Sequence, residues 1–113
     1  MAADVLQRYA DCIAACNACN VACQHCASLC LQEPNVKMMA RCIALDFDCA
    51  ELCSVSVALM AGGSELAGAM CGLCARACRM CAEECAKHDM DHCQQCAEAC
   101  RRCAEACERM AKS

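Results

Sequence analysis

Large aromatic side chains are nearly absent from this sequence. Its 113 residues include one Phe, one Tyr and no Trp, and much of the hydrophobic content of 60% is alanine and 19 cysteines. The side chains that usually fill a protein core are therefore scarce. A chain of this length fits one compact domain, and we predict a single domain spanning residues 1–113.

Clustered positive charge is also missing. The net charge of -4 comes from 14 acidic and 10 basic residues, and no basic run is longer than Arg101-Arg102. Binding to a phosphate backbone requires a basic surface, so we expect no nucleic-acid partner.

The longest uncharged stretch does not resemble a membrane span. Residues 12–32 lack Asp, Glu, Lys and Arg and are long enough to cross a bilayer. Polar side chains interrupt this stretch at Asn17, Asn20, Gln24, His25 and Gln32. Such residues are rare in a lipid-facing helix, so we expect no membrane association.

The beginning of the chain has no secretory pattern. Asp4, Arg8 and Asp11 lie where a signal peptide needs a basic start followed by an apolar run. We therefore expect a cytoplasmic protein. Reducing conditions there, together with an odd number of cysteines, favour free thiols or metal thiolates over disulfides.

Common catalytic and cofactor motifs are absent as well. We find no Ser-His-Asp arrangement, phosphate-binding loop or Glu-x-x-His pair, and therefore predict no enzyme activity. The CxxCH signature of c-type haem and the ferredoxin run that ends in Cys-Pro are also missing. CxxC pairs such as Cys16/Cys19 occur without a strand before them, so they do not indicate a thioredoxin-like site.

What the sequence does contain is a helical period of cysteine. In "CIAACNACNVACQHCASLC", residues 12–30, the cysteines follow each other at steps of four, three, four, three and four. Similar steps recur in residues 71–85 and 93–107, and they keep every cysteine on one face of a helix. Eight CxxxC pairs and three further cysteines make up the candidate metal ligands: Cys12, Cys16, Cys19, Cys23, Cys26, Cys30, Cys42, Cys49, Cys53, Cys71, Cys74, Cys78, Cys81, Cys85, Cys93, Cys96, Cys100, Cys103 and Cys107.

Turn signals separate these cysteine blocks. They predict helices near residues 3–32, 35–61, 64–87 and 89–111, with Ser64 and Asp89 as N-caps and Gly62-Gly63 at a helix C-terminus. Short connections favour antiparallel neighbours. We therefore predict an all-α fold, an antiparallel up-down-up-down four-helix bundle with a cysteine-lined core.

The second helix has the least regular stripe. Asp46 falls in step with Cys42, Cys49 and Cys53. Its carboxylate is a metal ligand, a hydrogen-bond acceptor or a side chain rotated toward solvent, and the sequence leaves the three alternatives open.

The cysteine stripes predict Cu(I) binding. Soft thiolates select Cu(I), zinc or iron-sulfur clusters, and Cu(I) accepts two or three sulfurs, whereas zinc requires four sulfurs that one straight helix face cannot supply. Isolated bis-thiolate Cu(I) units would crowd the core with negative charge, which favours bridging sulfurs and between about ten and roughly twenty ions per chain. Simple core packing is the alternative, but 19 small side chains would fill a bundle poorly.

Antiparallel topology gathers a polar group of residues at one end of the bundle. We expect copper to enter and leave there, with His88, His92, Met38 and Met39 as possible ligands beside Cys30, Cys42, Cys85 and Cys93. The alternative for the two histidines is a polar role at a helix turn, and one of the two methionines is expected in the core. His25 is expected at a surface or interface. The opposite end collects Val5, Tyr9, Met60, Leu66, Met70 and Met110, and we predict that it is closed.

With its eight CxxxC pairs on helical segments, the chain resembles the bacterial copper storage proteins, and the missing signal makes it similar to their cytosolic branch. The resemblance implies storage of many Cu(I) ions and a tetramer of bundles, and a protein that donates or accepts copper is a possible partner. Independently of the resemblance, the sequence predicts an oligomer interface on the first two helices, with the apolar residues Leu29, Ile43, Phe47, Val55 and Leu59.

Two other functions remain as alternatives. One is a helical counterpart of metallothionein that binds zinc or cadmium. The other is a thiol redox buffer, although i,i+4 cysteines on a helix stay parallel and form strained disulfides.

Overall fold

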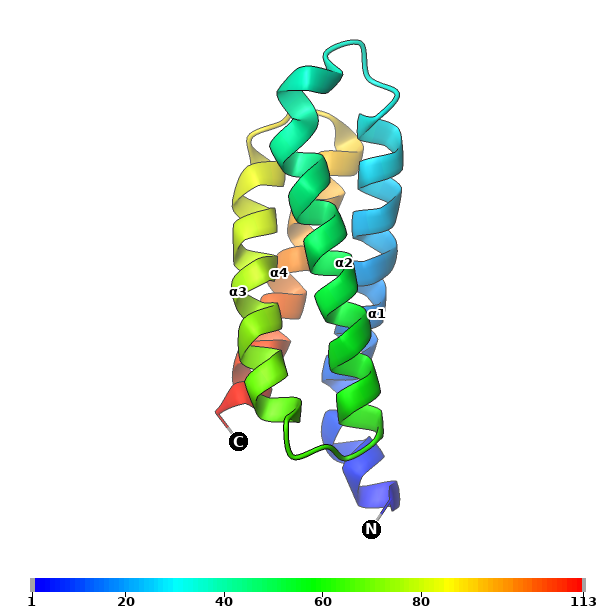
Figure 1. Ribbon diagram of the computed structural model, residues 1–113, viewed down its shortest axis with the longest axis vertical. Coiled ribbons are helices and arrows are strands. Elements are labelled where there is room, and N and C mark those ends of the chain that lie inside the picture. The colour runs from blue at the N-terminus through cyan, green and yellow to red at the C-terminus, as the bar shows by residue number, and fades with distance from the viewer. Residues whose placement is uncertain (1, 113) are drawn as a thin grey trace.

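The computed structural model describes residues 2–112, apart from the side chains of Ala2, Ala3 and Val5. It contains α1 (Ala2–Cys30), the short 3-10 helix η1 (Val36–Met39), α2 (Ala40–Ala61), α3 (Ala67–Ala86) and α4 (Asp91–Ala111). The four α-helices run alternately up and down in a bundle of 51 × 19 × 18 Å, and both ends of the chain lie at the same end of it (Figure 1). The predicted all-α, up-down-up-down bundle is confirmed.

Each long helix packs against two neighbours: α1 and α3 each contact both α2 and α4. Buried alanines lie on the sides of the cysteine stripes, and Ala27, Ala97 and Ala104 are fully buried. Because alanine is small and favours helix, it allows the helix backbones to approach closely. Among the described residues, no helix is both long and apolar enough to cross a bilayer.

Three of the four predicted helix starts were wrong by two or more residues. The segment expected to begin helix 2 at residue 35 first forms η1, and α3 and α4 begin at Ala67 and Asp91. Their N-caps are Leu66 and Met90, without a side-chain capping bond. The Ser64 hydroxyl accepts a hydrogen bond from the Leu66 N–H at 3.0 Å, which stabilises the turn before the helix and not its first turn.

The predicted glycine stop of helix 2 is confirmed. Gly62 is the C-cap, and Gly63 has a φ of 65°. The Gly63 N–H donates to the Met60 carbonyl at 3.1 Å, and the Ser64 N–H donates to the Leu59 carbonyl at 2.9 Å. These two bonds are those of a Schellman motif, which requires a residue that tolerates positive φ.

The two positions Gly63 and Gly72 should respond oppositely to the same substitution. Gly63→Ala places a side chain at positive φ and should lower the free energy of unfolding of the metal-free protein by about 1 kcal/mol. Gly72→Ala, inside α3, places a Cβ in ordinary contact 3.7 Å from the Ala111 Cβ and should raise it by about 0.5 kcal/mol. Urea unfolding under reducing conditions measures both, and equal effects would contradict this assignment of the turn.

A thiol core as the candidate metal centre

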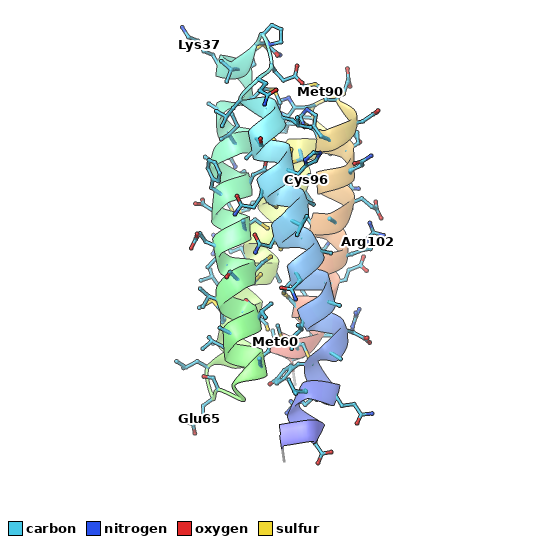
Figure 2. All side chains as sticks on the ribbon, turned by 90° about the vertical axis from the view of Figure 1, so that its right-hand side faces the viewer. Lys37, Met60, Glu65, Met90, Cys96 and Arg102 are labelled. Carbon is cyan, nitrogen blue, oxygen red and sulfur yellow. The ribbon has the colours of Figure 1, made fainter. Side chains whose placement is uncertain are left out.

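Every one of the 19 cysteines is a free, buried thiol. Their exposed fraction is 0% except at Cys12, where it is 2%. Figure 2 contrasts Cys96 and Met60, which lie between the helices, with Lys37, Glu65 and Arg102, which point outward. The prediction of a cysteine-lined core is therefore confirmed.

The sulfurs are as close across helices as along them. Within CxxxC pairs, the Sγ–Sγ distance is 3.9 Å for Cys19/Cys23 and 3.8 Å for Cys26/Cys30. Between helices, the Cys19 Sγ lies 3.6 Å from the Sγ of Cys49 and 3.6 Å from that of Cys100. The CxxxC pair is thus not an isolated unit. Contacts of 3.3 to 3.9 Å join sulfurs into clusters, and separations of up to 4.8 Å, as between Cys30 and Cys42, link these clusters into a network along the bundle.

These spacings suit metal ions with shared sulfurs. Two sulfurs at about 2.3 Å from one ion lie about 4.6 Å apart in a linear arrangement and about 4.0 Å apart in a trigonal one. Groups of four also occur, and the sulfurs of Cys16, Cys53, Cys74 and Cys103, one from each long helix, lie within 4.8 Å of one another. Such a group also has the ligand number that zinc prefers, so the four helices together supply what one helix face does not.

Asp46 is buried among the thiols, which excludes the solvent-facing alternative. Its Oδ1 accepts hydrogen bonds from the thiols of Cys81 at 3.1 Å, Cys96 at 3.2 Å and Cys85 at 3.5 Å. Burial, assisted by the nearby Cys96 and Cys42, raises the pKa of this carboxyl group to about 8. In the metal-free protein Asp46 therefore acts as a hydrogen-bond acceptor that links α2 to α3 and α4.

Three thiols near the ends of the network, those of Cys30, Cys71 and Cys93, are protonated at neutral pH. Burial raises the pKa of Cys30 to about 11 and that of Cys71 to about 12, and it also raises the pKa of Cys93. Because a metal binds the thiolate, ions that enter must displace these protons.

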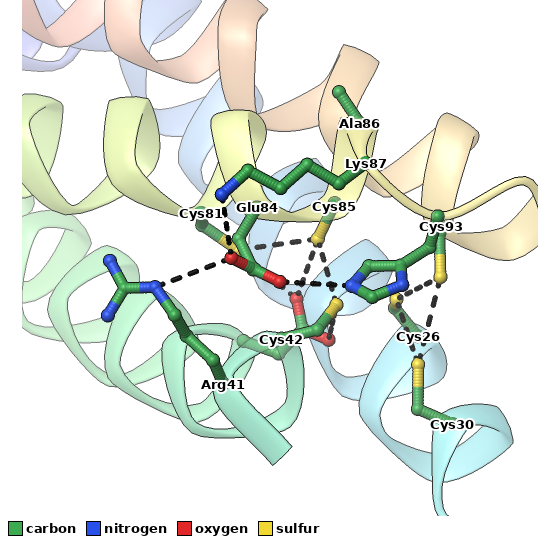
Figure 3. A network of polar contacts seen from close by, with 12 residues as sticks. Cys26, Cys30, Arg41, Cys42, Cys81, Glu84, Cys85, Ala86, Lys87 and Cys93 are labelled. Atoms are coloured by element: carbon green, nitrogen blue, oxygen red, sulfur yellow. Dashed lines mark hydrogen bonds and ion pairs between the residues drawn. The ribbon is translucent and has the colours of Figure 1, made fainter. Parts of the chain in front are cut away.

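At one end of the bundle, three sulfurs lie next to an imidazole. The Sγ atoms of Cys26, Cys30 and Cys93 are 3.8 to 3.9 Å apart (Figure 3). The Nδ1 of His92 is 3.6 Å from the Cys93 Sγ and 3.9 Å from the Cys30 Sγ. Its Nε2 lies 3.2 Å from the Glu33 Oε1. His92 is therefore close enough to take part in metal binding at this end.

His88 lies at the same end but has a different setting. Its Nε2 is 3.0 Å from the Glu84 Oε2, and the Glu84 Oε1 is 3.4 Å from both Arg41 Nε and Lys87 Nζ (Figure 3). Burial acts to raise the pKa of Glu84, but the hydrogen bond from His88 and the charge of Lys87 outweigh it, so this pKa lies below its usual range. Sequence reasoning missed Glu84, although its position four residues before His88 places the two side chains on one helix face.

The two methionines of this end are separated by the structure. Met39 is fully buried, whereas Met38 is 73% exposed. The expectation that one of them belongs to the core is confirmed, and Met38 points away from the sulfurs. His25 is exposed on α1, as predicted.

The opposite end is covered less completely than predicted. Tyr9 and Met60 are buried beneath the last thiols, and Met70 and Met110 are half-buried. Leu66 is 65% exposed and does not close this end, because it lies in the turn before α3. The predicted role of Val5 falls on a side chain outside the described residues.

A four-helix bundle with free thiols along its whole axis defines a cysteine-lined metal-binding bundle. This chain belongs to the copper storage protein family, whose sequence pattern matches residues 5–112. The Cu(I)-bound copper storage protein BsCsp3 is 46% identical, with a TM-score of 0.88 over 91% of this chain and 97% of that chain. A cytosolic copper storage protein from Streptomyces lividans, solved with five coppers, is 36% identical, with a TM-score of 0.92 over 98% of each chain.

The uncharacterized cysteine-rich protein YhjQ from Bacillus subtilis (strain 168) is also similar. The two are 45% identical over 71 residues, which is 62% of this chain and 66% of the length of that protein.

Asp46→Asn should remove a pH dependence of stability in the metal-free, reduced protein. The folded protein keeps the Asp46 proton up to about pH 8, whereas the unfolded chain releases it near its ordinary pKa of about 3.9. The contribution of Asp46 to stability is thus fully present at low pH and is lost as the pH rises from about 4 to 8. Urea unfolding measures the free energy of unfolding at about pH 5 and pH 8. Between these two values, wild type should lose more stability than Asp46→Asn. Equal losses would contradict the conclusion that buried Asp46 is protonated.

Proposed function

We propose that this protein stores Cu(I) in the cytoplasm as a bundle of buried copper thiolates. The observation that carries the proposal is the core of 19 buried thiols, many of which have a neighbouring sulfur at 3.3 to 3.9 Å. Sequestration of this kind limits the toxicity of free copper and keeps the metal available for later supply. No catalytic role is part of this proposal.

Charge balance favours Cu(I) ions that share bridging sulfurs over Cu(I) ions that are each bound by two unshared thiolates. A thiolate that serves two Cu(I) ions gives a core with nearly one positive charge per negative sulfur, and low-dielectric surroundings favour such neutrality. The proposed capacity is therefore about ten to roughly twenty ions per chain. Similar proteins support the choice of metal: BsCsp3 is solved as a Cu(I)-bound protein, and the Streptomyces lividans protein is solved with 10 copper equivalents.

All 19 cysteines are proposed as ligands, from Cys12 near one end to Cys30 and Cys93 at the other. Copper loading releases the protons of those thiols that burial keeps protonated in the metal-free protein, such as Cys30 and Cys93. Asp46 lies within reach of four of the thiols and accepts their hydrogen bonds before metal arrives.

The end with the histidines is proposed as the mouth, the place where copper enters and leaves. His92 is the ligand best placed for this role, because its Nδ1 already faces Cys30 and Cys93. His88 and the buried Met39 lie nearby as secondary ligands. The exposed Met38 is proposed only as a first contact for an arriving ion.

The protein is proposed to assemble as a homotetramer of bundles. Exposed apolar side chains on the outer faces of α1 and α2 support an interface there, including Val21 at 70%, Phe47 at 46% and Val55 at 40% exposure. A copper donor or acceptor protein is a further proposed partner. No nucleic acid or membrane is part of the proposal.

Anaerobic titration with Cu(I) tests the storage function. The fully reduced protein is titrated in the presence of a competing chelator, and copper per chain is measured after gel filtration, which also reports the size of the assembly. We expect retention of well over ten ions per chain, because sulfurs with neighbours on several helices can bridge.

A parallel titration with Zn(II), followed by competition between the two metals, provides the control. Retention of only a few copper ions, with zinc keeping its place, would favour the four-sulfur groups as zinc sites and contradict the proposed function.

The double variant His88→Ala/His92→Ala tests the mouth. It should slow copper uptake severalfold in stopped-flow mixing while the final number of ions stays near that of wild type, because the thiol network is untouched. The exposed His25→Ala is the matched control and should load at the wild-type rate. Unchanged uptake by the double variant would place the mouth elsewhere.

A further inference from the structure

We propose that Glu33 is a positioning residue that selects the tautomer of His92 and thereby aims an unprotonated nitrogen at the first copper-binding thiols. This inference rests on the proposed storage function and names a residue that sequence reasoning did not single out. The tautomer of His92, however, is a property of the metal-free protein and can be measured without copper.

His92 lies between a carboxylate and two sulfurs. Its Nε2 is 3.2 Å from the Glu33 Oε1, and its Nδ1 is 3.6 Å from the Cys93 Sγ and 3.9 Å from the Cys30 Sγ. The side chains of His92 and Glu33 are only 11% and 27% exposed. Water therefore competes only partly for the two ring nitrogens.

The backbone holds Glu33 in this place. Its N–H donates to the Cys30 carbonyl at 3.2 Å, in the turn that follows α1. Glu33 thus connects the last cysteine of α1 to the first turn of α4, where His92 precedes Cys93. The carboxylate is attached to the same turn as one of the sulfurs that the imidazole faces.

The tautomer follows from the donor and acceptor chemistry. A neutral imidazole has one N–H and one lone pair, and an ionised carboxylate only accepts hydrogen bonds. The Nε2 therefore carries the hydrogen and donates a hydrogen bond to Glu33, which leaves the Nδ1 lone pair toward the thiols. In metal sites a carboxylate partner of this kind fixes the ring and raises its basicity as a ligand.

His88 provides a contrast within the same mouth. Its Nε2 also faces a carboxylate, but Glu84 is shared with Arg41 and Lys87. Among the described residues, no hydrogen bond between His88 and a thiol is found. Both histidines have a carboxylate next to Nε2. Of the two, His92 is the one whose Nδ1 faces thiol sulfurs.

The test compares wild type, Glu33→Gln and Glu33→Ala as reduced, metal-free proteins at about pH 8, where an ordinary imidazole is neutral. Nitrogen-15 NMR of the imidazole reports the population of the Nε2–H tautomer of His92. We expect wild type to hold this tautomer, Glu33→Gln to be intermediate, because an amide both accepts and donates, and Glu33→Ala to be a mixture. Glu84→Gln should change the signals of His88 and leave the tautomer of His92 as in wild type.

Copper binding supplies the second readout. Under a competing chelator, the affinity for the first equivalent of Cu(I) should fall about 10-fold in Glu33→Ala, while the total number of ions retained stays the same. Glu65→Ala, in the turn at the opposite end, is the matched control and should match wild type in both measurements.

The outcomes separate this inference from the storage function. Equal tautomer populations in all three proteins, or an unchanged first affinity in Glu33→Ala, would overturn the role of Glu33. Failure of the wild-type protein to retain copper would instead overturn the storage function. Circular dichroism verifies that each variant folds, and if Glu33→Ala does not, the comparison of wild type with Glu33→Gln decides.

Discussion

The structure depends on the distance between sulfurs that the cysteine stripes impose. Steps of three and four keep the thiols on one helix face, and four antiparallel helices bring neighbouring sulfurs to 3.3 to 3.9 Å. Alanine beside the stripes permits this approach, as the fully buried Ala27, Ala97 and Ala104 show. A large aromatic side chain on the inner face would interrupt the network. The scarcity of aromatic residues is thus a requirement of a core that binds ions through shared ligands.

A core of this kind must remain nearly neutral both without and with its cargo. Without metal, burial keeps thiols such as Cys30 and Cys71 protonated, and Asp46, with its pKa raised to about 8, is largely protonated at neutral pH. With Cu(I), bridging would replace each proton by about one ion. Uptake then becomes an exchange of one positive charge for another, which avoids the free energy that uncompensated thiolates would cost in a low-dielectric interior.

The sequence predicted those features that repeat and missed those that depend on turns. Helix number, topology and the buried stripe follow from the cysteine period, which extends over several helical turns in each block. The orientation of Asp46 was left open because a helix can rotate by a fraction of a turn without breaking its pattern. Glu33 reaches His92 only because the chain reverses direction, whereas the i,i+4 spacing of Glu84 and His88 was present in the sequence and was overlooked. The helix starts at Ala67 and Asp91 reflect backbone turns without side-chain caps.

The closely spaced sulfurs also provide a route from the proposed mouth into a bundle 51 Å long. Because Cu(I) binds two or three thiolates, an ion can gain a third sulfur before it leaves one of its first two, and sulfurs at 3.3 to 3.9 Å are close enough for this. Cys19 has three such neighbours, on its own helix and on two others. We therefore propose that an ion bound near Cys30 and Cys93 advances from sulfur to sulfur, with a first step to Cys42, whose sulfur lies within 4.8 Å of theirs. The Glu33–His92 pair lies where this proposed path begins.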